Sequence, residues 1–107
     1  MTFEVNGNFW RIVYCNPSSH NLMRSDGSIT LGVCDNDKKC IFLNNRLNRH
    51  MTDKVLCHEL THVYSFEFGY VMDIQTEEIV ADFMSLYGRD IIYLADNIMS
   101  SLIRRIS

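Results

Sequence analysis

The residues His58-Glu59-Leu60-Thr61-His62 carry the clearest chemistry in this sequence of 107 residues. Residues four apart lie one turn apart on the same face of a helix, so both imidazoles can bind a single zinc ion. Glu59 lies next to the first histidine, where its carboxylate can reach a water on the ion without binding the ion itself. The alternative is that the two histidines merely pair with Glu59. The motif predicts a zinc site with Glu59 as its catalytic base.

A third zinc ligand is expected downstream of this motif. A catalytic zinc usually takes three protein ligands and leaves a fourth position for water. The other histidines, His20 and His50, both precede the motif, so a carboxylate is the natural third ligand. Glu78 is favoured because Asp82 lies one turn further along the same predicted helix, where it can orient a ligand histidine, His58 in our prediction. The other candidates are Glu77, which is the main rival, Asp73 and Asp82 itself.

These residues predict one Zn²⁺ per chain and hydrolysis of a peptide bond. Glu59 would take a proton from zinc-bound water, which attacks the scissile carbonyl, and pass the proton to the leaving amine. Residue spacing does not identify the donor to the developing oxyanion; the chemically suitable candidates are His20, Arg24, Tyr64 and Tyr70. A competing hypothesis is a non-proteolytic regulatory module that contains zinc and sequesters a protein partner. A weaker one is hydrolysis of a non-peptide amide.

The first half of the chain has the pattern of strands and the second half that of helices. Residues 9–15, 29–34 and 40–43 are predicted strands, and residues 35–39 form the expected hairpin loop between the last two. The second of these strands is expected to hold an extended substrate at the edge of a sheet. Residues 44–51 are polar and are expected to be irregular. The chain is therefore predicted to be an α+β protein.

Two helices are expected after residue 51. Thr52 or Asp53 would cap the first, which carries the histidine motif, and Gly69 would end it. The second would begin at Thr76 and continue almost to the C-terminus, with Gly88 left open as a bend or an interruption. Its apolar residues, from Ile91 to Ile106, are expected to pack within the domain; a dimer face is the alternative.

Composition limits the class of protein. The length predicts a single domain over residues 1–107. A net charge of -3 and a pI near 5.7 give no basic footprint for nucleic acid, and no apolar run approaches the ~20 residues of a membrane span. The N-terminus lacks the features of a signal peptide, so a cytoplasmic protein with reduced thiols is expected. The alternative is a disulfide between Cys34 and Cys40 across the hairpin.

The zinc motif and the run Glu78-Ile79-Val80-Ala81-Asp82 together resemble the gluzincins, whose type member is thermolysin. In that group, a helical H-E-x-x-H is joined by a glutamate from an E-x-x-x-D helix. The short length, the β-rich first half and residues 55–62 look closer still to the ImmA/IrrE-type metallopeptidases of bacteria, phages and mobile elements. The chain is most similar to short, phage-encoded members. The resemblance is specific over residues 55–90 and loose before them.

The resemblance implies a minimal gluzincin-like fold and a gluzincin-like activity. The fold would be a small, twisted, antiparallel-rich sheet packed beside the H-E-x-x-H helix and a C-terminal glutamate helix. The implied ligands are His58, His62 and Glu78, with Asp82 behind them. Relatives of this type act on a helix-turn-helix repressor encoded nearby, so the expected partner is a protein or peptide substrate, a repressor among them. Many of these relatives have a further domain, whereas a single domain is expected here.

Overall fold

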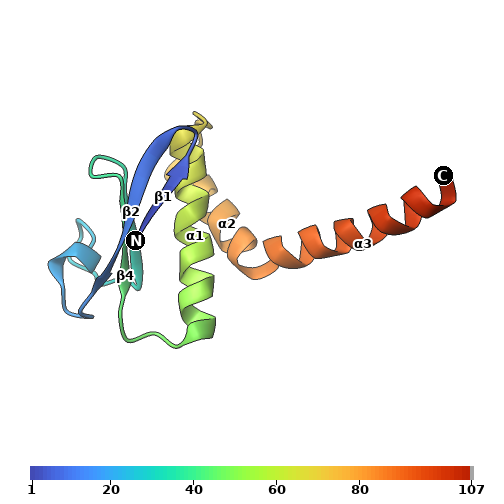
Figure 1. The fold of residues 1–107 in the computed structure, drawn as a ribbon. Helices are drawn as coiled ribbons and strands as arrows, with labels where there is room; N and C mark the ends of the chain where they lie inside the picture. The colour runs from blue at the N-terminus through green and yellow to red at the C-terminus, as the bar shows by residue number, and fades with distance from the viewer. Residues whose placement is uncertain (107) are drawn as a thin grey trace.

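A computed structural model describes the backbone of residues 1–106 and the side chains of residues 1–104. The fold is the predicted α+β class: one sheet packs against one face of a long helix, and a second helix lies beside the first (Figure 1). A third helix continues away from this body. The strands are β1 (Thr2–Val5), β2 (Asn8–Cys15), β3 (Gly32–Asp35) and β4 (Cys40–Asn44), and the main helices are α1 (Arg49–Glu67), α2 (Ile74–Phe83) and α3 (Arg89–Ile106).

The sheet is mixed, with strand order β1-β2-β4-β3. The outer pairs, β1 with β2 and β3 with β4, are antiparallel, in keeping with the predicted antiparallel-rich sheet, while β2 and β4 are parallel. After β2, the chain passes through residues 16–31 to the far edge of the sheet, forms β3 there and returns by a hairpin. This hairpin places β4 in the centre and leaves β3 at the edge. The strand expected at 29–34 is shorter and later, because Ile29 only bridges to Met23 before β3 begins.

Strand β1 was not predicted, although the sequence carries its signal. Asn6 and Gly7 form the two-residue turn between β1 and β2, with φ angles of 51° and 80°. Two successive positive φ angles define the turn type that joins tightly paired antiparallel strands, and Asn-Gly is its preferred sequence. The dipeptide therefore indicated a hairpin at the N-terminus.

Each face of the sheet has its own apolar cluster. The face toward α1 buries Val5, Trp10, Ile41 and Leu43 against Val63 of the helix. The opposite face buries Cys15, Leu22, Cys40 and Phe42 beneath the segment that contains the short 3-10 turn His20–Leu22. Cys34 packs on the α1 side of the sheet and Cys40 on the other. All four cysteines are free, so the alternative of a Cys34–Cys40 disulfide is wrong for this structure.

Helix α1 begins earlier than predicted. Asn48 is its N-cap, and the Asn48 side chain accepts a hydrogen bond from the Met51 N–H at 2.8 Å. The prediction that residues 44–51 are irregular, with a cap at Thr52 or Asp53, is therefore wrong at residues 49–51. Asparagine is among the best capping residues, and its side chain satisfies a donor that the first turn leaves free. The expected end is confirmed, because α1 stops at Glu67 and Gly69 follows with a φ of 67°.

The helices after Gly69 differ from the prediction in where α2 starts and in how exposed α3 is. Asp73 caps α2 by accepting a hydrogen bond from the Thr76 N–H at 2.8 Å, so α2 starts at Ile74 and not at Thr76. The chain then passes through one π-helical turn, Met84–Gly88, directly into α3.

The apolar residues of α3 were expected to pack within the domain, and this is wrong for those whose side chains are described: Ile91, Ile98 and Leu102 are 45–50% exposed. The side chain of Ile106 lies outside the described residues. None of the helices in residues 1–106 is long and apolar enough to cross a membrane.

Candidate metal centre

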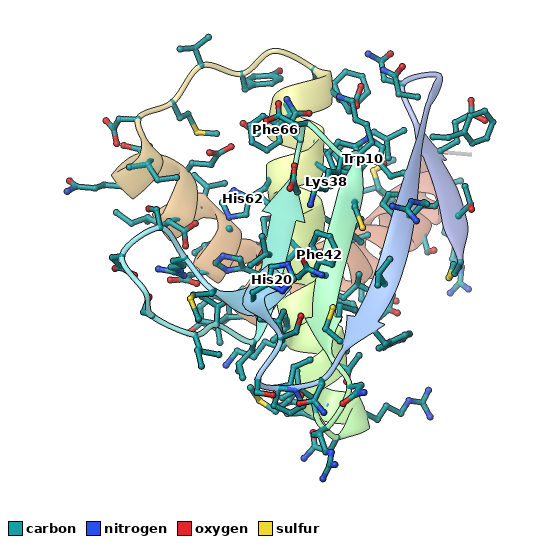
Figure 2. All side chains as sticks on the ribbon, turned by 90° about the vertical axis from the view of Figure 1, so that its left-hand side faces the viewer. Trp10, His20, Lys38, Phe42, His62 and Phe66 are labelled. Atoms are coloured by element: carbon teal, nitrogen blue, oxygen red, sulfur yellow. The ribbon has the colours of Figure 1, made fainter. Side chains whose placement is uncertain are left out.

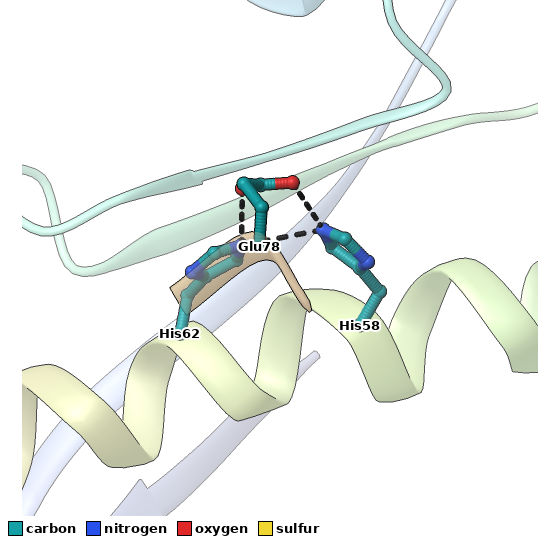
Figure 3. Close-up of side chains that lie close together, drawn as sticks. All are labelled: His58, His62 and Glu78. Carbon is teal, nitrogen blue, oxygen red and sulfur yellow. Dashed lines mark hydrogen bonds and ion pairs between the residues drawn. The ribbon is translucent and has the colours of Figure 1, made fainter. Parts of the chain in front are cut away.

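Helix α1 presents His58 and His62 side by side on the face that turns toward α2 (Figure 3). Their Nε2 atoms lie 3.3 Å apart, and the two rings meet edge to face. Helical spacing alone places the rings on one face. Burial then restricts them, because the His62 side chain is 8% exposed and that of His58 is 17% exposed.

Glu78 of α2 completes a triangle of three candidate ligand residues, with one carboxylate oxygen facing each histidine. Its Oε1 lies 2.9 Å from His62 Nε2, and its Oε2 lies 3.2 Å from His58 Nε2. Ligands at the usual zinc distances, arranged tetrahedrally, lie about 3.3 Å from one another. The nearest atoms of each pair of side chains lie 2.9 to 3.3 Å apart, close to this spacing, although each histidine faces a different oxygen of Glu78. Among the described residues, they form the group whose ligand atoms could share one metal ion.

The other ring nitrogens of the two histidines face carboxylates. His58 Nδ1 lies 3.0 Å from Asp82 Oδ1, and His62 Nδ1 lies 3.6 Å from Glu77 Oε2. A carboxylate at Nδ1 favours the tautomer that carries its proton there and keeps the Nε2 lone pair free. Asp82 thus lies beside His58, as predicted. Glu77, the main rival for the third ligand, faces Nδ1 of His62, whereas Glu78 faces Nε2.

This arrangement fits a divalent cation on chemical grounds. With protons on both Nδ1 atoms, two Nε2 lone pairs and the Glu78 carboxylate all converge as acceptors on one point. Acceptors that face one another repel unless a cation lies between them. Two nitrogens and one carboxylate oxygen are a zinc donor set, and three protein ligands leave the fourth position that catalysis needs. The residues present therefore fit zinc.

Glu59 lies on the neighbouring face of α1, beneath the edge strand β3. The residue is 6% exposed, and this burial raises the pKa of its carboxyl group, while the charges of His62 and His58 act in the opposite direction. A Cβ on Gly32 of β3 would lie 3.2 Å from Glu59 Cγ and 2.6 Å from Val55 Cγ1. The absence of a side chain at Gly32 is what lets the edge strand approach the base this closely.

Two adjoining cavities, of about 450 and 200 Å³, lie along this edge. They share Arg24, Gly32 and Glu59, and each includes one of the two motif histidines. The larger cavity lies between β3 and α2 and contains Glu77 and Glu78. Arg24 belongs to the 23–29 loop, in which the predicted Asp26-Gly27 turn is present with a Gly27 φ of 87°. Of the four candidates for the oxyanion donor, Arg24 is the one that the structure brings to the site cavities.

The remaining candidates lie elsewhere. His20 belongs to the 3-10 turn on the sheet face that carries Phe42, whereas His62 points between α1 and α2 (Figure 2). Tyr64 lines a separate groove on the other side of α1. Asp73, a possible third ligand by sequence, serves as the α2 cap. Sequence reasoning did not single out Gly32 or choose Arg24, since neither belongs to a spaced motif.

Comparison with known proteins identifies the family of the chain. Searches of curated proteins and of solved structures find no match. A profile of a peptidase family, described as the IrrE N-terminal-like domain, matches residues 11–101, which span the sheet from β2 onward, both motif helices and most of α3. The match covers most of the 107 residues and includes every residue of the metal centre. The chain therefore belongs to the IrrE N-terminal-like domain family of peptidases, as the resemblance in its sequence indicated.

Proposed function

We propose that this protein is a zinc metallopeptidase of the gluzincin type, with one ion held by His58, His62 and Glu78. The observation that carries the proposal is the convergence of His58, His62 and Glu78, whose nearest side-chain atoms lie 2.9 to 3.3 Å apart, with the buried carboxylate of Glu59 beside them. A site that held zinc only for structure would normally close all four positions with protein atoms. It would also have no use for a buried glutamate at position 59.

The bound ion would acidify a water and polarise the scissile carbonyl. Glu59 would serve as the general base, because its burial raises its pKa toward the range in which a carboxyl group can both take up and release a proton. The same carboxyl group would return that proton to the leaving amine. Asp82, 3.0 Å from His58 Nδ1, would favour the tautomer that carries its proton on that atom, and the Glu77 carboxylate, 3.6 Å from His62 Nδ1, would favour the same tautomer by its charge. Arg24 supplies positive charge at the mouth of the cleft, where negative charge develops on the carbonyl oxygen.

The substrate we propose is an extended segment of a protein. Strand β3 is at the edge of the sheet and pairs only with β4, so its outer backbone groups can bind a substrate as an added strand. This edge runs along the two cavities beside Glu59. A helix-turn-helix repressor is the substrate that the family resemblance suggests, and the repressor assignment stays a prediction.

The direct test of the proposed activity is Glu59→Gln. Zinc-loaded wild type and variant are incubated with a peptide library from a cellular digest, and new termini are counted by mass spectrometry. We expect the variant to keep its fold and about one zinc per chain but to lose cleavage by at least 100-fold, since the general base alone contributes about 10²–10⁴-fold. Glu4→Gln, the same change at an exposed residue of β1, is the matched control and should cleave normally.

A zinc-loaded wild type that produces no more termini than Glu59→Gln would contradict the proposal. The same zinc site would then belong to a binding module that sequesters a protein partner.

A further inference from the structure

Helix α3 projects away from the body of the domain (Figure 1), and its broad apolar face is left exposed by the described residues. Its large apolar residues recur at helical spacing, and its polar residues, such as Asp90 and Asn97, occupy the opposite side. The apolar residues are between 45% and 58% exposed: Ile91, Ile92, Ile98, Met99, Leu102 and Ile103. An apolar stripe of this width is what a helix shows when it packs on a partner surface.

A second uncovered apolar surface lies on the body of the domain. The face of α1 that turns away from the sheet borders a groove of about 620 Å³. Cys57, Leu60 and Tyr64 line it from α1, and Met84 and Ile92 line it from the π-helical turn and the start of α3. Tyr64 is 54% exposed and stacks on Phe68, which is 49% exposed, so the apolar surface continues along α1.

The α3 helix of the same chain does not fill this groove. The chain runs from α2 through Met84–Gly88 into α3 without a loop, so α3 leaves the body in a nearly continuous helix. To fold back onto its own α1, the chain would have to break this helix near Gly88. A second copy needs no such break, because its α3 arrives from outside.

We infer that two copies of this chain form a symmetric dimer in which α3 of each packs along the outward face of α1 of the other. Every copy carries both complementary surfaces, which is the condition for a closed pair in which each contact occurs twice. The lengths also match, because α3 has 18 residues and α1 has 19, or about 27 and 28 Å of helix. The 620 Å³ groove shares no described lining residue with the two cavities at the metal centre, so this pairing leaves the zinc site open.

The exposed area is sufficient for a stable pair. The six residues of the α3 face, with Met84, Tyr64 and Phe68, are all large and roughly half exposed. A half-exposed side chain of this size leaves on the order of 80 Å² in water, so these residues offer each protomer about 700 Å². Specific interfaces bury about 800 Å² per partner. The area on offer lies within the range of roughly 600–1,000 Å² per partner that such interfaces span.

The test is the mass of the full chain in solution, measured by sedimentation equilibrium across the micromolar range. We expect the wild type to have twice the 12.5 kDa of one chain. Ile98→Glu, in the apolar face, should weaken the dimer by about 100-fold or more, because it places a charge in the centre of the interface. Asn97→Glu adds the same charge one residue away on the polar side and should leave the dimer intact. Tyr64→Glu should weaken it from the groove side.

Cys57 reports on the groove independently. In the dimer, α3 of the partner covers it, so its labelling by a maleimide, located by mass spectrometry, should be slower in wild type than in Ile98→Glu. A wild type that is monomeric at every concentration would overturn the proposal and leave the face to another protein or a lipid surface. A dimer that persists in both Ile98→Glu and Tyr64→Glu, or one that Asn97→Glu weakens equally, would also overturn it. None of these readouts depends on zinc or on cleavage.

Discussion

The metal centre contains three residues that would bind the ion and carboxylates that lie behind the two histidine rings. The role of the carboxylates can be tested separately. Asp82 Oδ1 lies 3.0 Å from His58 Nδ1 but does not face the ligand triangle. We expect Asp82→Ala to weaken zinc binding by about 10–100-fold, because the His58 ring loses the partner that fixes its tautomer. Competition with a chromophoric chelator measures this affinity.

The control for that experiment is Asp90→Ala, which removes an exposed carboxylate from α3, and it should bind zinc as tightly as wild type. Equal zinc affinity in Asp82→Ala would mean that Asp82 is a solvated side chain with no influence on the site.

The motif residues were predictable because their chemistry depends on spacing within one helix. His58, Glu59 and His62 lie within about 1.1 turns of one helix, so the sequence determines their relative placement. The preference for Glu78 over Glu77 came from the same reasoning, because Glu78 and Asp82 share a face of α2. What spacing could not reveal is that Glu77 faces the back of His62, since this contact depends on how α2 packs against α1.

At the scale of elements, the site requires β3 to lie close to α1. Gly32 makes this possible, because a Cβ there would be 2.6 Å from Val55 Cγ1. We expect Gly32→Ala to lower the free energy of unfolding by about 1–3 kcal/mol, the usual cost of overpacking, and to reduce cleavage by moving the edge strand away from Glu59. Chemical denaturation measures the first effect and the peptide assay the second.

Val55→Ala provides the control for this contact. Combined with Gly32→Ala, it removes the Cγ1 atom that the new methyl group would meet, so the double variant should be more stable than the sum of the single effects predicts. Purely additive effects would show that β3 and α1 are not in the close contact described here.

Glu67, the last residue of α1, accepts hydrogen bonds from the β1–β2 hairpin. Trp10 Nε1 donates to Glu67 Oε1 at 2.8 Å, Lys39 Nζ lies 3.1 Å from the same oxygen, and Asn8 donates to Oε2. Hydrogen bonds from Asn8 and Trp10, followed by the Lys39 contacts, lower the Glu67 pKa below its ordinary 4.5. The charged Glu67 carboxylate therefore stabilises the folded state fully above pH 4.5. This stabilisation is lost as the pH falls through the lower pKa that Glu67 has in the folded state.

Glu67→Gln should accordingly be less stable than wild type at pH 7, and the difference should shrink as the pH falls below 4.5. Thermal unfolding between pH 7 and pH 3 measures it, and Glu4→Gln, at an exposed position, should show no such convergence. A constant difference between Glu67→Gln and wild type at all pH values would contradict the role of the carboxylate charge.

The elements themselves were predicted unevenly, for physical reasons. Helix α1 and its end at Gly69 were predicted from local signals. Strand β1 could have been predicted in the same way, because Asn6-Gly7 is a typical hairpin turn. The parallel pairing of β2 with β4 was not predictable, because it joins residues that are some 29 positions apart through an irregular segment. The exposed course of α3 was also missed, since periodicity shows that a helix has an apolar face but not what covers it.

At the scale of the whole molecule, bound zinc would fasten α2 to α1, the helix that packs against the sheet. Its ligands come from α1 and α2, and α2 packs mainly against α1 and the π-helical turn that follows it. Zinc at 100 times its dissociation constant should raise the free energy of unfolding by about 2.7 kcal/mol, provided the unfolded chain does not bind it. Denaturation with zinc and with a chelator measures the difference. The gain should vanish in Glu78→Ala, and a gain that persists there would place the ion elsewhere.

The central claim, a zinc site formed by His58, His62 and Glu78, is tested most directly by metal content per chain. Wild type, Glu78→Ala and Glu77→Ala are reconstituted with zinc, passed over a desalting column and analysed by elemental mass spectrometry. The account predicts about one zinc per chain in wild type and in Glu77→Ala, and little or none in Glu78→Ala. Two results would contradict this zinc site: a wild type that binds no stoichiometric zinc, or zinc that is absent from Glu77→Ala and present in Glu78→Ala.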